Sequence, residues 1–450
     1  MMSTTLQTLT KKFTIFIGCT LFCSALNAAE ITDVADAADF VQIGKQRVMD
    51  PFDLYVNTTF KLESMSGIIA RESTLEDNCS VANPRSCTPR DELKWSRSVQ
   101  MLNIGMETGL YKDLALVLDF DLVLGNTLEF DYATGIDAGS SSIDQGDTST
   151  ALFDHDYAAY HKGMRGINFG VRYGPLNDER DPTKPMWVLS FIWKTPYLST
   201  TYDPVDAASK NDPGPVGDGI HRLTFGTAFS KRLGYFGDML LERKNLYRRG
   251  YLEPYVAINY ALPIPDDSKA LSPNKPSTSN EFRRPPSHEV NLKGGLEVIA
   301  VEDIRYGRKI SFDVGVDTTY FTEGRNLSIL SNPLKELTYT EQFLRVAGVL
   351  GANLQLAPYF RLRTGLHFGA QTPYFVTYED VGEDGANGTP DGQVLPNDPN
   401  DKLNPYFCMN DENDICYEKN LASSYDQVGF RFRNTSTNFF RWFISLILTF

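Results

Sequence analysis

The sequence predicts an all-β protein: a single closed antiparallel barrel of about twelve strands that crosses a membrane. Three observations predict this fold. Segments of alternating apolar and polar residues recur along the chain, as expected for strands with one apolar face. The linkers between these segments alternate between long and short. The last eleven residues, 440–450, place a large apolar side chain at every second position, and a tilted strand crosses a bilayer in roughly 9–11 residues.

The amino-terminal segment 1–29 has the pattern of a secretory signal peptide. A basic pair precedes an apolar run, residues 13–26, and two alanines follow at 28–29. We expect cleavage after one of these alanines. The alternative, lipoprotein processing at Cys19, is disfavoured by the bulky Phe16 three residues before it.

The composition restricts the class of protein. The 450 residues carry a formal charge of -14, which becomes -16 when the two leader lysines are removed. A negative balance argues against nucleic acid as a partner. The chain has no run of eighteen apolar residues, so a membrane-spanning helix is not expected. Phe, Tyr and Trp make up 12% of the chain, which fits the aromatic girdles of membrane barrels.

The first three strands show how the pattern is interpreted. In Phe52–Leu62 the apolar side chains take the even positions and polar ones lie between them. The segment 102–107 repeats this alternation. In Leu114–Leu124, the clearest strand, Leu and Phe alternate with Ala, Val and two aspartates. Aspartates opposite an all-apolar face suit a barrel with lipid outside and a polar lumen better than a sandwich core.

Nine further strands follow. The segment 187–193 is apolar on both faces, so the pattern does not assign its inward side. In 310–320 and 360–368 acidic and basic residues, respectively, occupy the face opposite the apolar one. The nine are expected at 167–173, 187–193, 220–231, 256–262, 290–298, 310–320, 344–356, 360–368 and 440–450.

The linkers support the same architecture. Long polar linkers follow the odd-numbered strands, and shorter ones follow the second, fourth, eighth and tenth. The exception is the basic segment 233–249, interpreted as an enlarged periplasmic turn with a short helix near 238–246. An even strand number places both ends of the barrel chain on one side. We therefore expect residues 30–50 to form a periplasmic segment and 51–450 the barrel. The alternative for residues 30–50 is a plug that enters the barrel. The alternative for the barrel is fourteen strands instead of twelve.

Together these features resemble bacterial outer-membrane β-barrels, which have long outer loops, short periplasmic turns and an aromatic residue ending the last strand. The resemblance covers the whole mature chain, and the segments 109–114 and 254–256 look like those of large, mostly uncharacterised proteobacterial proteins. It implies a porin-like protein of the Gram-negative outer membrane, in contact with lipid and lipopolysaccharide. It also implies that the barrel-assembly machinery recognises the last strand. The residues expected to carry that signal are Phe440, Trp442 and Phe450.

Four cysteines remain after the leader. Cys79 and Cys87 lie in one polar linker, and Cys408 and Cys416 in another, each pair eight residues apart. In an oxidising compartment such local pairs indicate two loop disulfides. Pairing across the two linkers stays open, and zinc is disfavoured because no histidine lies near either pair.

Charged residues on the expected inward faces are the candidates for lining a pore. Two interpretations remain open: a ladder of ion pairs between neighbouring strands, or a constriction whose basic wall (Arg345, Arg361, Arg363) faces an acidic one (Asp119, Asp121). The second arrangement would orient and select small polar solutes. The full set of candidates is Glu107, Asp119, Asp121, Arg172, Asp313, Asp317, Arg345, Arg361, Arg363 and His367.

The sequence contains no convincing catalytic or metal motif. No His-x-Ser pattern occurs, and the acidic group around His155 lies in a polar loop. The oxygen-rich segments 398–401 and 411–414 could hold calcium but lack the spacing of an EF-hand loop. We therefore expect that the protein is not an enzyme and that it holds no cofactor or resident metal. The leading function is passage of small hydrophilic solutes, and the alternative is a structural or surface-recognition barrel that acts through its disulfide-tied loops.

Overall fold

The computed structural model describes most of the strands and part of the linkers. The described parts are residues 54–72, 89–111, 113–143, 156–177, 183–196, 209–233, 247–265, 286–303, 306–334, 337–377 and 430–450, together with 32, 199, 382–383, 388–389, 400 and 402–403. No helix in these parts is long and apolar enough to span a membrane.

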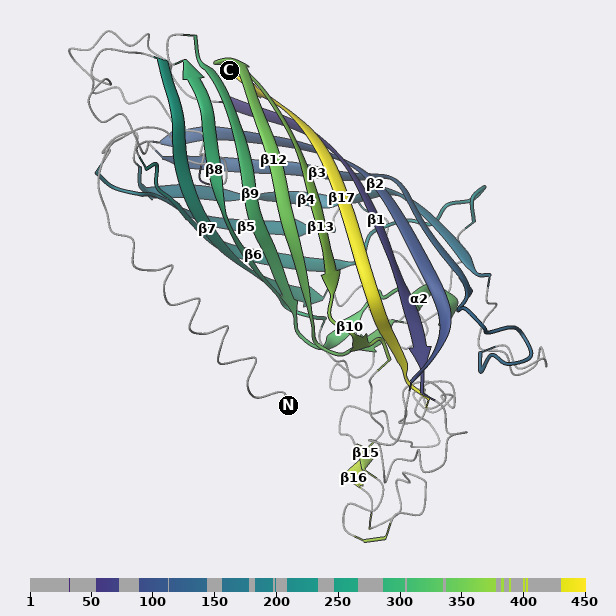
Figure 1. Cartoon of the computed structure of the whole chain (residues 1–450). Coiled ribbons are helices and arrows are strands. Elements are labelled where there is room, and N and C mark those ends of the chain that lie inside the picture. Colours follow the sequence, from purple (N-terminus) through teal and green to yellow (C-terminus); the bar gives the residue numbers. More distant parts are fainter. Residues whose placement is uncertain are drawn as a thin grey trace, which may run out of the picture.

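Twelve long strands form one closed antiparallel barrel, seen from the side in Figure 1. Because the ring is closed by pairing of the first strand with the last, it has no place for a further pair, so the predicted twelve is confirmed over the alternative of fourteen. The strands are β1 (Leu54–Arg71), β2 (Arg90–Tyr111), β3 (Leu114–Tyr132), β4 (Ala158–Leu176), β5 (Met186–Thr195), β6 (Ile220–Ser230), β7 (Tyr247–Pro265), β8 (Glu289–Asp303), β9 (Arg308–Phe321), β12 (Phe343–Ala357), β13 (Phe360–Gln371) and β17 (Phe432–Thr449).

The seam of the barrel lies where β17 meets β1. Their backbones pair over nearly their whole length, from Tyr55 opposite Thr449 to Arg71 opposite Phe432. Beyond the last strand residue, the amide and carbonyl of Phe450 exchange two 3.0 Å hydrogen bonds with Leu54. Both ends of the barrel chain therefore lie at one end of the cylinder, here called the terminal end; the opposite end is called the loop end.

The connections follow the predicted alternation. Those at the terminal end are short, such as 112–113 and 358–359, and those at the loop end are long, such as 133–157 and 372–431. The connection after β6, residues 231–246, is the longest at the terminal end, as expected for the enlarged turn predicted there. Part of the segment predicted as a basic turn belongs to β7, which already begins at Tyr247. The helix predicted near 238–246 falls outside the described residues.

Large apolar side chains cover the outside of the barrel near the terminal end. Leu118 is 37% exposed, Phe225 49% and Val314 54%. A soluble protein rarely exposes such a continuous apolar surface, whereas a membrane barrel presents an apolar band to lipid. Exposed aromatic residues mark the terminal edge of this band, as in an interfacial girdle; they are Tyr111, Tyr173, Tyr306, Tyr359 and Phe450. The architecture is that of a bacterial outer-membrane β-barrel.

Several strands extend beyond the sequence prediction toward the loop end. β2 was expected at 102–107 but begins at Arg90, and β3 continues past Leu124 to Tyr132. In these extensions the two faces exchange character. Lys94, Ser96 and Ser98 point outward and Leu93 and Trp95 inward, whereas nearer the terminal end the outward side chains are apolar. We call the two parts of each strand the loop half and the belt half.

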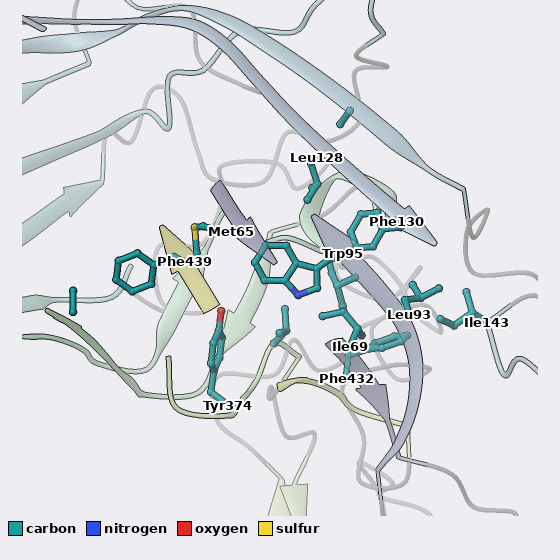
Figure 2. Close-up of a cluster of buried hydrophobic side chains, with 14 residues drawn as sticks. Met65, Ile69, Leu93, Trp95, Leu128, Phe130, Ile143, Tyr374, Phe432 and Phe439 are labelled. Carbon is teal, nitrogen blue, oxygen red and sulfur yellow. The ribbon is translucent and has the colours of Figure 1, made fainter. Parts of the chain in front are cut away.

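The hydrophobic core lies inside the loop half. Trp95 packs among side chains from β1, β3 and β17 (Figure 2). Its Nε1 donates a 3.0 Å hydrogen bond to Asn434 Oδ1. Burying each such aromatic or aliphatic side chain stabilises the folded protein by roughly 1.5–3 kcal/mol. The cluster includes Met65, Ile69, Leu93, Trp95, Leu128, Phe130, Ile143, Leu330, Tyr374, Val376, Phe432 and Phe439. It lies at the loop end of the space enclosed by the barrel, here called the bore.

Candidate functional site

The bore of the belt half carries the polar face predicted from sequence. Side chains alternate along each strand, so the residues between the exposed apolar ones point inward. Asp313 and Asp317 of β9 thus share the bore with Arg363 and His367 of β13. These four predicted residues line a common cavity, while the other six predicted residues lie outside its lining.

Ion pairs join the strands of this wall. Lys293 pairs with Asp317 on the adjacent strand, whereas Arg363 and His367 of β13 reach β9 across the intervening β12. Arg363 Nη2 lies 3.8 Å from Asp313 Oδ2, and Asp313 also accepts a 2.6 Å hydrogen bond from the Tyr255 hydroxyl. Asp317 Oδ2 lies 3.6 Å from Lys293 Nζ and 3.9 Å from His367 Nδ1. These contacts join β7, β8, β9 and β13 across one wall.

A second wall is built from β2, β3 and β4. Arg172 Nη1 donates to Glu107 Oε2 at 2.9 Å. Asp121 accepts from Asn103 at 2.9 Å and from Asn168 at 3.3 Å. Asp119 lies one inward position nearer the terminal end, and strand order places β3 opposite β9, six strands away in the ring. The acidic pair therefore faces the acidic strand β9 more directly than the arginines of β13.

Arg345 and Arg361 occupy different levels of the bore. The Arg345 guanidinium lies 5.5 Å from the Phe321 ring centroid and 5.3 Å from that of Phe439, at the border with the apolar cluster. Arg361 lies toward the terminal end, opposite Ile447. The two are 16 positions apart in sequence but belong to adjacent strands running in opposite directions. The constriction formed by these arginines with Arg363 stays a prediction.

The cavity has a volume of about 330 Å³, within the bore of the belt half. Its walls come from strands on both sides of the ring, because at least four strands lie between Lys61 of β1 and Lys293 of β8 in either direction. Four lysines and arginines and three carboxylates line it, among uncharged polar groups. The lining residues are Asn57, Thr59, Lys61, Asn103, Tyr255, Lys293, Glu297, Asp313, Val316, Asp317, Val349, Asn353, Arg363, His367, Arg441, Phe443 and Ser445.

Four charged lining residues were not among the predicted candidates: Lys61, Lys293, Glu297 and Arg441. Their signal was present in the sequence, because each occupies the face opposite the apolar one in its strand. Glu297 pairs with Lys309 at 2.9 Å, and Arg441 Nε donates to Glu63 Oε2 at 2.7 Å. The strand pattern identifies the inward face but not the level at which a cavity opens.

A linker crosses the bore at the loop end. The connection 322–342 between β9 and β12 contains β10 (Gly324–Asn326), α2 (Ser331–Leu334) and β11 (Thr338–Thr340). Leu330 is buried in the apolar cluster with side chains of β1, β2 and β3. Asn332 Nδ2 lies 3.1 Å from Nε2 of His161 on β4, which is six strands from β12 in the ring. This linker, expected to be an outer loop, therefore spans the full width of the bore.

A buried ion pair network lies at the terminal end. Arg232, 1% exposed, lies between Glu253 at 3.3 Å and Glu302 at 3.2 Å. Ser230 donates to Glu253 at 3.1 Å and forms a 2.7 Å hydrogen bond with the hydroxyl of Thr32. Thr32 is fully buried and is the described residue of the segment 30–50, so at this point that segment contacts the barrel.

A further charged group lies at the start of β6, just outside the strands. Asp218 forms an ion pair with Arg222, which also lies 3.6 Å from Glu289. Burial acts to raise the pKa of Asp218, but the positive charges of Arg222, Lys194 and Arg165 outweigh it and hold that pKa below its ordinary value. Asp218 is therefore an anion that neutralises part of a basic region at the loop-end rim.

Several sequence predictions concern residues outside the described parts. These include the signal peptide, all four cysteines of the proposed disulfides, His155 and most of the two oxygen-rich segments. Within the described residues, no group of three or more His, Cys, Asp or Glu side chains is placed to hold a metal ion. The predicted assembly residues lie on the outer face of β17 and at the end of the chain, with Phe440 44% and Phe450 65% exposed.

Comparisons with known proteins find only distant similarity. No protein-family model matches the chain, and no curated protein matches it. An outer membrane channel of Pseudomonas putida F1 is 10% identical, with a TM-score of 0.36, covering 88% of this chain and 95% of that one. A FadL homologue of Pseudomonas aeruginosa and a deltaS2 mutant of the TodX monoaromatic hydrocarbon channel are each 8% identical over 88% of this chain and 90% of theirs, with TM-scores of 0.29 and 0.27. Similarity this weak carries no functional assignment.

Proposed function

We propose that this barrel passes small hydrophilic solutes across the outer membrane of a Gram-negative bacterium. The observation that carries the proposal is the cavity of about 330 Å³ inside the belt half, whose walls bear charged and amide side chains. A wall of this kind replaces part of the hydration of a polar solute, which a bilayer does not. The proposed orientation places the termini in the periplasm and the long linkers outside, in contact with lipopolysaccharide.

The size of the cavity and the linker 322–342 restrict the solutes. Ligand sites typically occupy about 300–1,000 Å³, so the cavity is at the small end of that range. The linker and the apolar cluster occupy the loop end of the bore. We therefore expect small conductance and discrimination by size and charge, rather than a wide general pore.

The proposal is tested with purified protein in planar lipid bilayers. Stepwise conductance is expected from the wild-type protein. Changing both Arg361→Glu and Arg363→Glu is expected to lower the anion-to-cation permeability ratio, because two positive charges in the bore become negative. Unchanged ion preference would show that these arginines do not line the path.

A structural or surface-recognition barrel is the second candidate, favoured by one observation. The loop end is filled by packed side chains and by a linker tied to the opposite wall through Asn332 and His161. If the barrel conducts, deleting residues 330–334 is expected to raise conductance, since it removes the part that crosses the bore. If neither the wild-type protein nor the deletion variant shows conductance, the second candidate is favoured and the first is rejected.

A further inference from the structure

We propose that the cavity binds a small oxyanion, a carboxylate or a phosphate, through the ammonium group of Lys61. The inference deepens the proposed function and rests on it for its biological role, since it makes anionic solutes the preferred cargo. The binding step itself concerns one cavity and can be tested without transport.

The carboxylates that line the cavity are all engaged by other groups. Glu297 pairs with Lys309 and accepts a hydrogen bond from Ser311. Asp313 accepts from the Tyr255 hydroxyl and pairs with Arg363. Asp317 accepts a 2.5 Å hydrogen bond from Asn291 and pairs with Lys293. The negative charge in the lining is therefore compensated locally.

The same contacts compensate three of the four lysines and arginines. Arg363 pairs with Asp313, Lys293 with Asp317, and Arg441 with Glu63. Lys61 differs, because within the described residues it makes no ion pair within 4.0 Å and no hydrogen bond. Asp121 and Asp119 attract Lys61 only from a greater distance. The cavity is thus lined by one cation that no described carboxylate contacts directly.

The surroundings of Lys61 favour a mobile anion, rather than a carboxylate of the protein itself, as its direct partner. The acids nearest in register, Asp119 and Asp121, are on β3, and β2 separates them from β1. Asp121 already accepts two amide hydrogen bonds, from Asn103 and Asn168. A charge held away from bulk water lacks full hydration, and a mobile counter-ion can supply the missing interaction without a conformational change.

Asn57 offers a second donor on the same strand face. Its Oδ1 accepts hydrogen bonds from the hydroxyls of Thr59, at 3.0 Å, and Ser445, at 2.6 Å. The two hydroxyls fix the orientation of the amide and leave its Nδ2 group, which has no partner in the described residues, for a ligand in the cavity. An oxyanion has several acceptor oxygens and suits an ammonium and an amide that line one wall.

The binding test uses the full-length mature protein in detergent, titrated by calorimetry with inorganic phosphate and, separately, with acetate. The Kd for at least one probe is expected to rise tenfold or more in Lys61→Gln, equivalent to about 1.4 kcal/mol. Lys94→Gln is the matched control, because Lys94 is exposed at the loop end and donates a hydrogen bond to Thr134 Oγ1. It should leave binding unchanged, and heat-modifiable migration on gels checks that each variant is folded.

Each outcome bears on one proposal or the other. If phosphate binds and acetate does not, the site is selective for phosphate, and the reverse identifies carboxylate. Equal affinities in wild type and Lys61→Gln, or no binding of either probe to the wild-type protein, would overturn the assignment. In bilayers, Lys61→Glu is expected to lower the anion-to-cation permeability ratio at least threefold. If binding depends on Lys61 but the protein shows no conductance in bilayers, the binding site is retained and the proposal of solute passage is rejected.

Discussion

The belt half and the loop half of the barrel are built from the same strands with opposite arrangements of side chains. In β2, Leu102, Ile104 and Met106 point outward in the belt half, whereas Lys94 and Ser96 do so in the loop half. The inward face changes in the reverse sense, from Asn103 and Gly105 to Leu93 and Trp95. The difference follows from the solvent outside: lipid selects an apolar exterior, and water selects a polar one.

The comparison explains why the two halves have different interiors. The belt half gains little from an apolar core because its exterior is already apolar, so its bore can remain polar and contain a cavity. The loop half is exposed to water and is stabilised, like a soluble β-protein, by burying Trp95, Phe130 and Phe432 inside. The polar cavity and the apolar core that stabilises the barrel are therefore separated along the barrel axis.

The largest effect is expected from Trp95→Ala, which should destabilise the folded barrel by about 3–5 kcal/mol. Trp95 is 3% exposed, and its truncation leaves a cavity and removes the hydrogen bond to Asn434. Unfolding by urea in lipid vesicles, followed on heat-modifiable gels, measures the change. Asn103→Ala, an inward position of the belt half, is the comparison and should cost far less. Equal losses would show that the loop half has no dominant core.

A smaller effect is expected from charges on the outer face. Leu118→Arg should cost about 2–4 kcal/mol, because it places a guanidinium against lipid in the apolar band. Glu129→Arg lies on the outer face of the same strand in the loop half, where the native side chain is charged and exposed, and should change stability by less than about 0.5 kcal/mol. The same vesicle unfolding experiment measures both. A large loss with Glu129→Arg would place that face against the membrane as well.

Most of the belt half could be predicted from sequence, because a period of two with one apolar face is a local signal. The loop-half extensions were missed for a physical reason. Where Trp95 and Leu93 point inward, the apolar residues shift to the opposite set of positions, so the pattern that identifies the belt ends at about Gln100. A second pattern of reversed sense begins there and looks like a polar linker.

The site was only partly predictable. Strand parity predicts inward faces for Asp313, Asp317, Arg363 and His367, and in the structure these four line one cavity. The level of the cavity depends on how strands stagger around the ring, and the crossing of the bore by 322–342 depends on the distant contact of Asn332 with His161. Neither is encoded in a local pattern, because both result from long-range packing.

The smallest effect concerns the polar interior of the belt half. Glu63 and Arg441 lie on paired strands at the seam, with Nε to Oε2 at 2.7 Å, and their side chains are 19% and 29% exposed. Water in the bore screens such a pair, so a double-mutant cycle with Glu63→Gln and Arg441→Met should give a coupling of about 0.2–1 kcal/mol. Vesicle unfolding of the two single variants and the double variant measures it. A coupling of 3 kcal/mol or more, the range of buried ion pairs, would mean that the bore excludes water at this level. The contrast between a hydrated, polar interior in the belt half and an apolar interior in the loop half would then be wrong.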